Sequence, residues 1–143
     1  MDRNTRELLK ECDAGIKTAQ SSIGEVIDSV KSRDLKRILE DSKRRHGALE
    51  NKIERVLAAE GETGREPNAA AKAATWMKIN FKMGTDPCDA TVAEVMFDGC
   101  SMGVKALSKY LNKYDSATED AKNYARKLIE MEDTLMTDLR TFL

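Results

Sequence analysis

The sequence predicts an all-α fold, a bundle of four long helices in which a long crossover joins the second helix to the third. Apolar residues recur at three- and four-residue spacing over four long stretches, the pattern of amphipathic helices. No stretch shows the alternation of a strand. The connection between the second and third stretches is far longer than a tight turn requires. We expect residues 1–143 to form one domain of this kind.

The first two helices are expected over residues 5–30 and 34–60. Asn4 or Thr5 can cap the first helix, and Asp34 can cap the second, because short polar side chains accept hydrogen bonds from the free amides at a helix start. Only a short polar break separates the two helices, so they should be antiparallel neighbours.

The crossover is expected over residues 61–87. Gly61 ends the second helix, and Asp86-Pro87 breaks the chain before the third. An alanine-rich helix is expected over residues 69–83 inside it. A connection of this length can run along the whole bundle, so the helices on either side of it should be parallel. This is the connection of ferritin-like bundles.

The second pair of helices is expected over residues 88–114 and 118–142. Thr118 is a suitable N-cap for the fourth helix, and the two acidic residues after it suit the first turn of a helix. The turn between the third and fourth helices is again short, so they should form a second antiparallel hairpin.

A short pattern, Cys-x-x-Gly-aliphatic-Lys, occurs in the first helix and again in the third. It places Cys12 and Gly15 in one copy and Cys100 and Gly103 in the other. A glycine inside a helix costs about 1 kcal/mol relative to alanine, so it usually has a packing or functional reason. We interpret the glycines as a close crossing of the first and third helices, with the cysteines as small core residues; room for a ligand is the alternative.

Composition excludes several classes of protein. The chain has 24 basic and 25 acidic residues, interspersed, which argues against nucleic-acid binding. Its three cysteines form no CxxC motif, which argues against a zinc ribbon. We see neither a signal peptide nor an apolar run long enough for a membrane span. A cytoplasmic location is therefore the expectation.

Two polar residues interrupt the apolar stripes of the second and fourth helices: His46, the only histidine, and Glu132. They could hydrogen-bond to each other, or each could lie at the edge of the core. A metal site is a further alternative, with His46, Glu132, Glu130 and Asp133 as candidate ligands for iron or manganese. Di-iron bundles use Glu-x-x-His on two helices, and here Lys43 occupies the glutamate position before His46. The ligand count therefore argues against a standard di-iron site.

Histidine phosphotransfer is a more distant alternative. It needs an exposed imidazole with a cation nearby to receive phosphate. The residues around the turn after His46 are Leu49 and Glu50, which do not supply that cation.

The chain resembles a bacterial group of ferritin-like proteins classed as a domain of unknown function. Three segments carry the resemblance: Gly15-Ile16-Lys17-Thr18-Ala19, Ala74-Thr75-Trp76-Met77-Lys78 and Ala106-Leu107-Ser108-Lys109-Tyr110. The resemblance implies the crossover bundle and brings no activity with it.

These observations favour a non-enzymatic protein that acts by association, as a homodimer or with a helical partner. No catalytic residue and no cofactor is expected under this interpretation. The transition-metal bundle is the alternative, and it would centre on His46 and Glu132.

Overall fold

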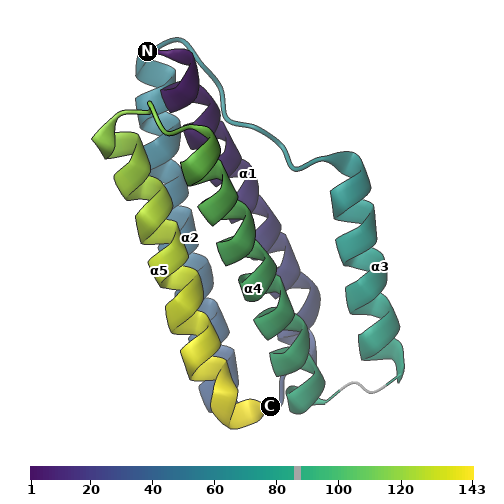
Figure 1. Ribbon diagram of the computed structural model, residues 1–143. Coiled ribbons are helices and arrows are strands. Elements are labelled where there is room, and N and C mark those ends of the chain that lie inside the picture. Colours follow the sequence, from purple (N-terminus) through teal and green to yellow (C-terminus); the bar gives the residue numbers. More distant parts are fainter. Residues whose placement is uncertain (86–87) are drawn as a thin grey trace.

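The computed structural model describes residues 1–85 and 88–143, except for the side chains of residues 71, 74, 76, 77 and 81. Four long helices pack into a bundle (Figure 1), and a fifth lies beside it. Their bounds are α1 Arg3–Val26, α2 Arg33–Ala59, α3 Ala69–Thr85, α4 Asp89–Lys113 and α5 Glu119–Leu139, with short 3-10 turns at Ile27–Ser29 and Arg140–Phe142. The predicted all-helical bundle is confirmed.

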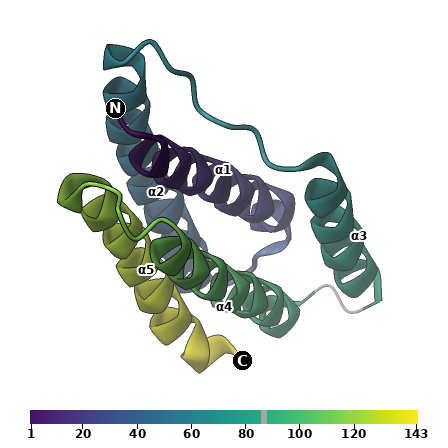
Figure 2. The same ribbon diagram turned by 45° about the horizontal axis from the view of Figure 1, so that its top comes forward.

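The directions of the helices show that the crossover between α2 and α4 runs along the length of the bundle. Both α2 and α4 rise towards the end of the bundle where the N-terminus lies, and α1 and α5 run the other way (Figure 1). The chain therefore returns along the bundle between α2 and α4, through the coil of residues 60–68 and then through α3. Helix α3 contacts α1 and α4, and it stands outside the bundle in both views (Figure 2). The expected break at Asp86-Pro87 and the side chain of Trp76 lie outside the described residues.

The helix starts correct two of the expected caps. Asp2, not Asn4 or Thr5, caps α1, because its carboxylate accepts from the Thr5 amide at 2.9 Å. Ser32, not Asp34, caps α2, because its hydroxyl accepts from the Leu35 amide at 3.2 Å. The predicted cap at Thr118 is confirmed by its bond from the Ala121 amide at 3.3 Å.

The helix ends also differ from expectation. The α-helix of α1 stops at Val26 and tightens into a 3-10 turn, so it ends before residue 30. Gly61 has φ 72° after the end of α2, a backbone conformation that glycine adopts most readily. At the starts of α1 and α2, short polar side chains lie close together in the sequence, so more than one of them could serve as the N-cap.

The core consists of two apolar clusters, one towards each end of the bundle. The cluster near the N-terminus includes Leu8, Leu9, Ile16, Ile53 and Leu128. The other includes Ile23, Leu39, Val92, Leu135 and Leu139. The three- and four-residue spacing of apolar residues predicted these buried positions. A layer of polar residues, described below, lies between the two clusters.

An ionic ladder holds the coil of the crossover against α1. Lys10 donates to Glu62 at 2.8 Å, and the Arg65 guanidinium donates to Glu7 and Glu11, each at 2.7 Å. The basic and acidic side chains of α1 thus pair with an acidic and a basic side chain of the coil. These pairs direct the crossover along α1.

A single carboxylate links the α1–α2 turn to the start of α4. Asp89 accepts from the backbone amides of Lys31 at 2.8 Å and Ser32 at 3.0 Å. The two amides belong to the turn and have no helical carbonyl partner of their own. Asp89 therefore joins the two hairpins at the end of the bundle away from the N-terminus.

Replacing Asp89 with alanine should lower the free energy of unfolding by about 1–2 kcal/mol, because two backbone amides lose a charged acceptor. Urea unfolding measures the change. Glu130→Ala is a matched control, since Glu130 is exposed and pairs only loosely with Lys127 at 3.8 Å. Equal losses in the two variants would contradict the linking role of Asp89.

Candidate functional site

The polar centre of the bundle is a contact between His46 of α2 and Glu132 of α5. The imidazole Nε2 lies 2.5 Å from Glu132 Oε1. His46 is 0% exposed and Glu132 is 6% exposed. The two residues that interrupt the apolar stripes therefore meet each other inside the core. They lie between the two apolar clusters, where an unpaired polar group would be costly.

The other ring nitrogen shows where the protons of this pair lie. His46 Nδ1 is 2.7 Å from the Ser42 carbonyl oxygen. A carbonyl can only accept, so Nδ1 carries hydrogen and donates. One further proton then lies between Nε2 and the carboxylate. Burial alone lowers the pKa of His46, but the hydrogen bond and charge of Glu132, with the Ser42 carbonyl, outweigh it and raise that pKa above its usual value.

Helix α4 closes the other side of the Glu132 carboxylate. A Cβ placed on Gly103 would lie 3.7 Å from Glu132 Oε2. The thiol of Cys100, one turn earlier, is buried, and its pKa is raised by burial and then by the charge of Glu132. Three helices therefore enclose the carboxylate.

The repeated glycines face α5, not each other. A Cβ on Gly15 would meet Leu128 at 4.0 Å, one turn from the Glu132 that faces Gly103. Both distances are ordinary van der Waals contacts, and Gly15 is exposed, so a side-chain carbon would fit at either position. The close α1–α4 crossing that the repeat suggested stays a prediction. Cys12 and Cys100 are buried in the apolar clusters, and burial first, then the charges of neighbouring carboxylates, raise the pKa of Cys12 to about 12.

The other two candidate ligands point away from the histidine. Glu130 and Asp133 are exposed and help line an open surface hollow of about 390 Å³ on α5. Of the four candidate metal ligands, the structure brings together only His46 and Glu132. The phosphotransfer alternative loses its basis as well, because His46 is fully buried and phosphotransfer needs an exposed imidazole.

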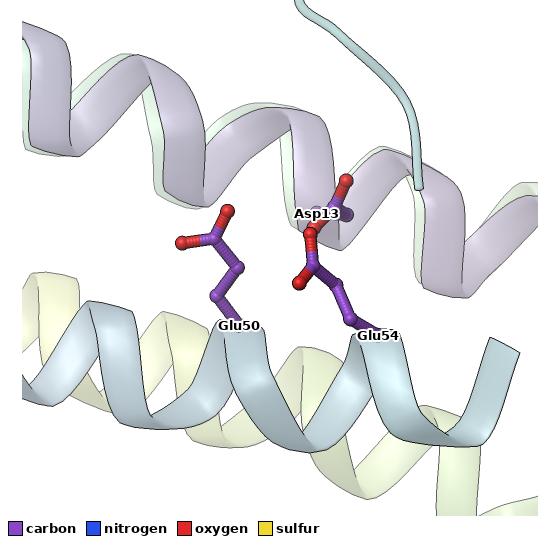
Figure 3. Close-up of side chains that lie close together, drawn as sticks. All are labelled: Asp13, Glu50 and Glu54. Carbon is purple, nitrogen blue, oxygen red and sulfur yellow. The ribbon is translucent and has the colours of Figure 1, made fainter. Parts of the chain in front are cut away.

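A second polar cluster lies between α1 and α2, and the sequence reasoning missed it. It consists of Asp13, Glu50 and Glu54, whose side chains converge in Figure 3. One potential ligand atom from each lies within 4.8 Å of the others. Asp13 belongs to the first copy of the repeat. Its spacing from Leu9 and Ile16, four and three residues, places it on the apolar face, and this was the available signal.

Asp13 is completely buried, and its two oxygens are in different situations. Oδ2 accepts from the Lys17 ammonium at 2.7 Å and from the Arg65 amide at 2.8 Å. Oδ1 is buried without a hydrogen-bond partner. The coil can approach this closely because residue 64 is glycine; a Cβ there would overlap the Asp13 carboxylate.

Glu50 and Glu54 complete the cluster from α2, one turn apart. Gln20, in the amide orientation that satisfies its neighbours, donates to Glu50 at 2.9 Å. Burial and then the negative charges of Asp13 and Glu54 raise the pKa of Glu50. Lys17 lies 3.8 Å from Glu54. The cluster therefore combines a half-buried, an exposed and a fully buried carboxylate with one ammonium group.

Comparison with known proteins supports the fold and does not extend to a function. No family model and no curated protein matches the chain. YcfI, "a putative structural protein" from Rhodopseudomonas palustris, has a similar structure, with a TM-score of 0.78 and 13% identity over 96% of this chain and 90% of that one. The conserved hypothetical protein rv2844 from Mycobacterium tuberculosis has a TM-score of 0.73 and 13% identity, covering 100% and 99% of the two chains.

At 13% identity these likenesses show a shared helical fold alone. The ferritin-like family that the sequence resembles is not among these matches. Within the described residues, every helix is too short or too polar to cross a membrane.

The raised pKa of His46 predicts a specific pH dependence. The stabilisation by the His46–Glu132 pair should be complete below about pH 6.5, the usual histidine value, and be lost as the pH rises through the raised pKa of the folded protein. In Glu132→Gln the charge that raises the pKa of His46 is removed and burial still lowers that pKa. Stability should then rise with pH up to about pH 6.5 and should no longer fall above it. Urea unfolding at several pH values measures both trends.

His46 is the only histidine in the chain, so its NMR signals report its pKa without ambiguity. Glu130→Gln serves as the control, because that exposed residue lies away from the pair. The same pH dependence in the wild type and in Glu132→Gln would contradict the assigned role of the carboxylate.

Proposed function

We propose that this protein is a non-enzymatic bundle of the ferritin-like type that works by assembling with a second copy of itself. The observation that carries the proposal is the position of α3, which stands outside the four-helix bundle (Figure 2). A hollow lies between residues of α1 and α3. The hollow has a volume of about 340 Å³. A helix held beside a bundle in this way presents a surface that a partner can cover.

The hollow has the properties of a self-complementary surface. Its α1 side carries the small residues Thr18, Ser21 and Ser22, which allow close approach, and its α3 side carries Ala73. Most dimers have twofold symmetry, in which the same patch from both copies meets.

Exposed charges on the rim favour a second copy as the occupant. Glu25 lies on the α1 side and Lys72 on the α3 side. A twofold axis through the patch would place Glu25 of each copy near Lys72 of the other, so the same pair of opposite charges forms twice. YcfI, which has a similar fold, is itself called "a putative structural protein", and this description is compatible with the proposal.

The polar centre supports a structural role from inside the bundle. His46 and Glu132 satisfy each other and are closed off from solvent. Buried polar pairs of this kind can select one helix arrangement over others. The proposal assigns them that role, and no catalytic residue is needed.

Light scattering coupled to gel filtration should show a dimer, and Lys72→Glu should weaken it about three- to tenfold, because a symmetric patch then meets like charges twice. The double variant Lys72→Glu/Glu25→Lys should restore the dimer. Lys127→Glu, an exposed lysine on α5, is the matched control. A monomer at high concentration, or a dimer that Lys72→Glu does not weaken, would overturn the proposal.

A further inference from the structure

The cluster of Asp13, Glu50 and Glu54 has the composition and the shape of a cation site. All three side chains offer carboxylate oxygens, which calcium prefers as ligands. They come from two helices and lie close together at the α1–α2 interface (Figure 3), with one ligand atom of each within 4.8 Å of the others. We propose that this cluster binds one divalent cation of the calcium class.

The unpartnered oxygen of Asp13 is the observation that points to a ligand. Asp13 is 0% exposed, and its Oδ1 atom has no hydrogen-bond partner. An unsatisfied buried charged oxygen is strongly unfavourable. Arg65 and Lys17 bind the other oxygen, Oδ2. The coil and Lys17 both bind Oδ2, so Oδ1 is the oxygen that neither of them reaches.

Lys17 is the obvious competitor for the role of counter-ion, but it does not balance the charge. Its ammonium lies 2.7 Å from Asp13, 3.4 Å from Glu66 and 3.8 Å from Glu54. One positive charge thus serves Asp13, Glu54 and Glu66, and Glu50 adds a fourth carboxylate nearby. A divalent cation would supply the missing charge, and Lys17 can keep its bond to Oδ2.

The dimensions suit one calcium ion. Calcium binds oxygen at about 2.4 Å, so two ligands on opposite sides of the ion are about 4.8 Å apart. The three ligand atoms lie within 4.8 Å of one another. The Glu54 side chain is 46% exposed, so water can reach this side and complete a shell of six to eight oxygens.

The ion would fix the crossover as well as the two helices. Arg65 and Gly64 hold Asp13 from the coil side, and Glu50 and Glu54 hold the ion from α2. Occupancy would therefore link α1, α2 and the start of the crossover. This inference is independent of dimer formation, because the cluster lies within one copy.

Isothermal titration of the full chain with calcium chloride should show one ion per chain, and the melting temperature should rise with calcium. Glu54→Gln should weaken binding at least tenfold, since it removes one charged ligand and keeps the side-chain shape. Glu54 is partly exposed, so the variant should fold, and circular dichroism confirms this. Glu94→Gln is the matched control: Glu94 belongs to another carboxylate cluster, which already contacts Lys82 at 3.1 Å.

Manganese gives the location independently of any variant. It binds the same oxygen ligands, and its paramagnetism should broaden the amide signals of Asp13, Glu50 and Glu54 first. The proposal is wrong if calcium shows no binding up to about 5 mM, beyond the weak class of protein calcium sites. It is also wrong if Glu54→Gln binds as the wild type does, if Glu94→Gln is equally weakened, or if broadening begins elsewhere.

Discussion

The buried carboxylate of Asp13 is the constraint on which the crossover depends. A carboxylate taken out of water is costly unless charge and hydrogen bonds compensate for it. Lys17 supplies the charge from the next turn of α1. The backbone amide of Arg65 supplies a hydrogen bond, and it can do so only when the coil lies directly on α1. Gly64 permits that approach, because a Cβ there would occupy the space of the carboxylate. The compensation of this one charge therefore fixes the coil against α1 at Gly64 and Arg65, and the ion pairs of Lys10 and Arg65 extend the contact along the helix.

A second buried polar contact, between His46 and Glu132, lies at the centre of the bundle and is closed off from solvent. The pair of His46 and Glu132 is closed on all sides by α2, α4 and α5, and it divides the core into two apolar clusters. Sliding α5 by one turn would separate the two side chains and place Glu132 among leucines. Such a separation would be unfavourable, so the pair selects against that wrong helix register, the role proposed for it above. Asp13, in contrast, lies at the edge of the bundle next to carboxylates that water can reach.

Sequence periodicity was sufficient for the helices and pointed to the residues of one of the two polar clusters. His46 and Glu132 each interrupt an otherwise apolar stripe, so a mutual hydrogen bond was one interpretation and a position at the edge of the core was the other. Thr118 was predicted as a cap because two acidic residues follow it in the first turn, whereas at α2 both Ser32 and Asp34 were available and hydrogen-bond geometry decided. Asp13 was missed although its spacing from Leu9 and Ile16 places it on the apolar face of α1, because spacing alone does not identify what covers a carboxylate. The coil, more than 50 residues away in sequence, completes its burial, as the 52-residue separation of the Arg65–Asp13 bond shows, and such a contact has no local signal.

The two copies of the Cys-x-x-Gly-aliphatic-Lys pattern have similar packing, but only the first copy carries a buried carboxylate. Each copy places a cysteine in the core and a glycine against α5, so the packing roles are matched. The residue after the cysteine is Asp13 in α1 and Ser101 in α4, and the lysines that end the copies are Lys17 and Lys105. Ser101 and Lys105 are exposed, while Asp13 is buried and bound to Lys17. The crossover causes this difference, because its coil covers α1 at this level. A carboxylate was therefore useful only in the first copy, where the coil could turn it towards α2.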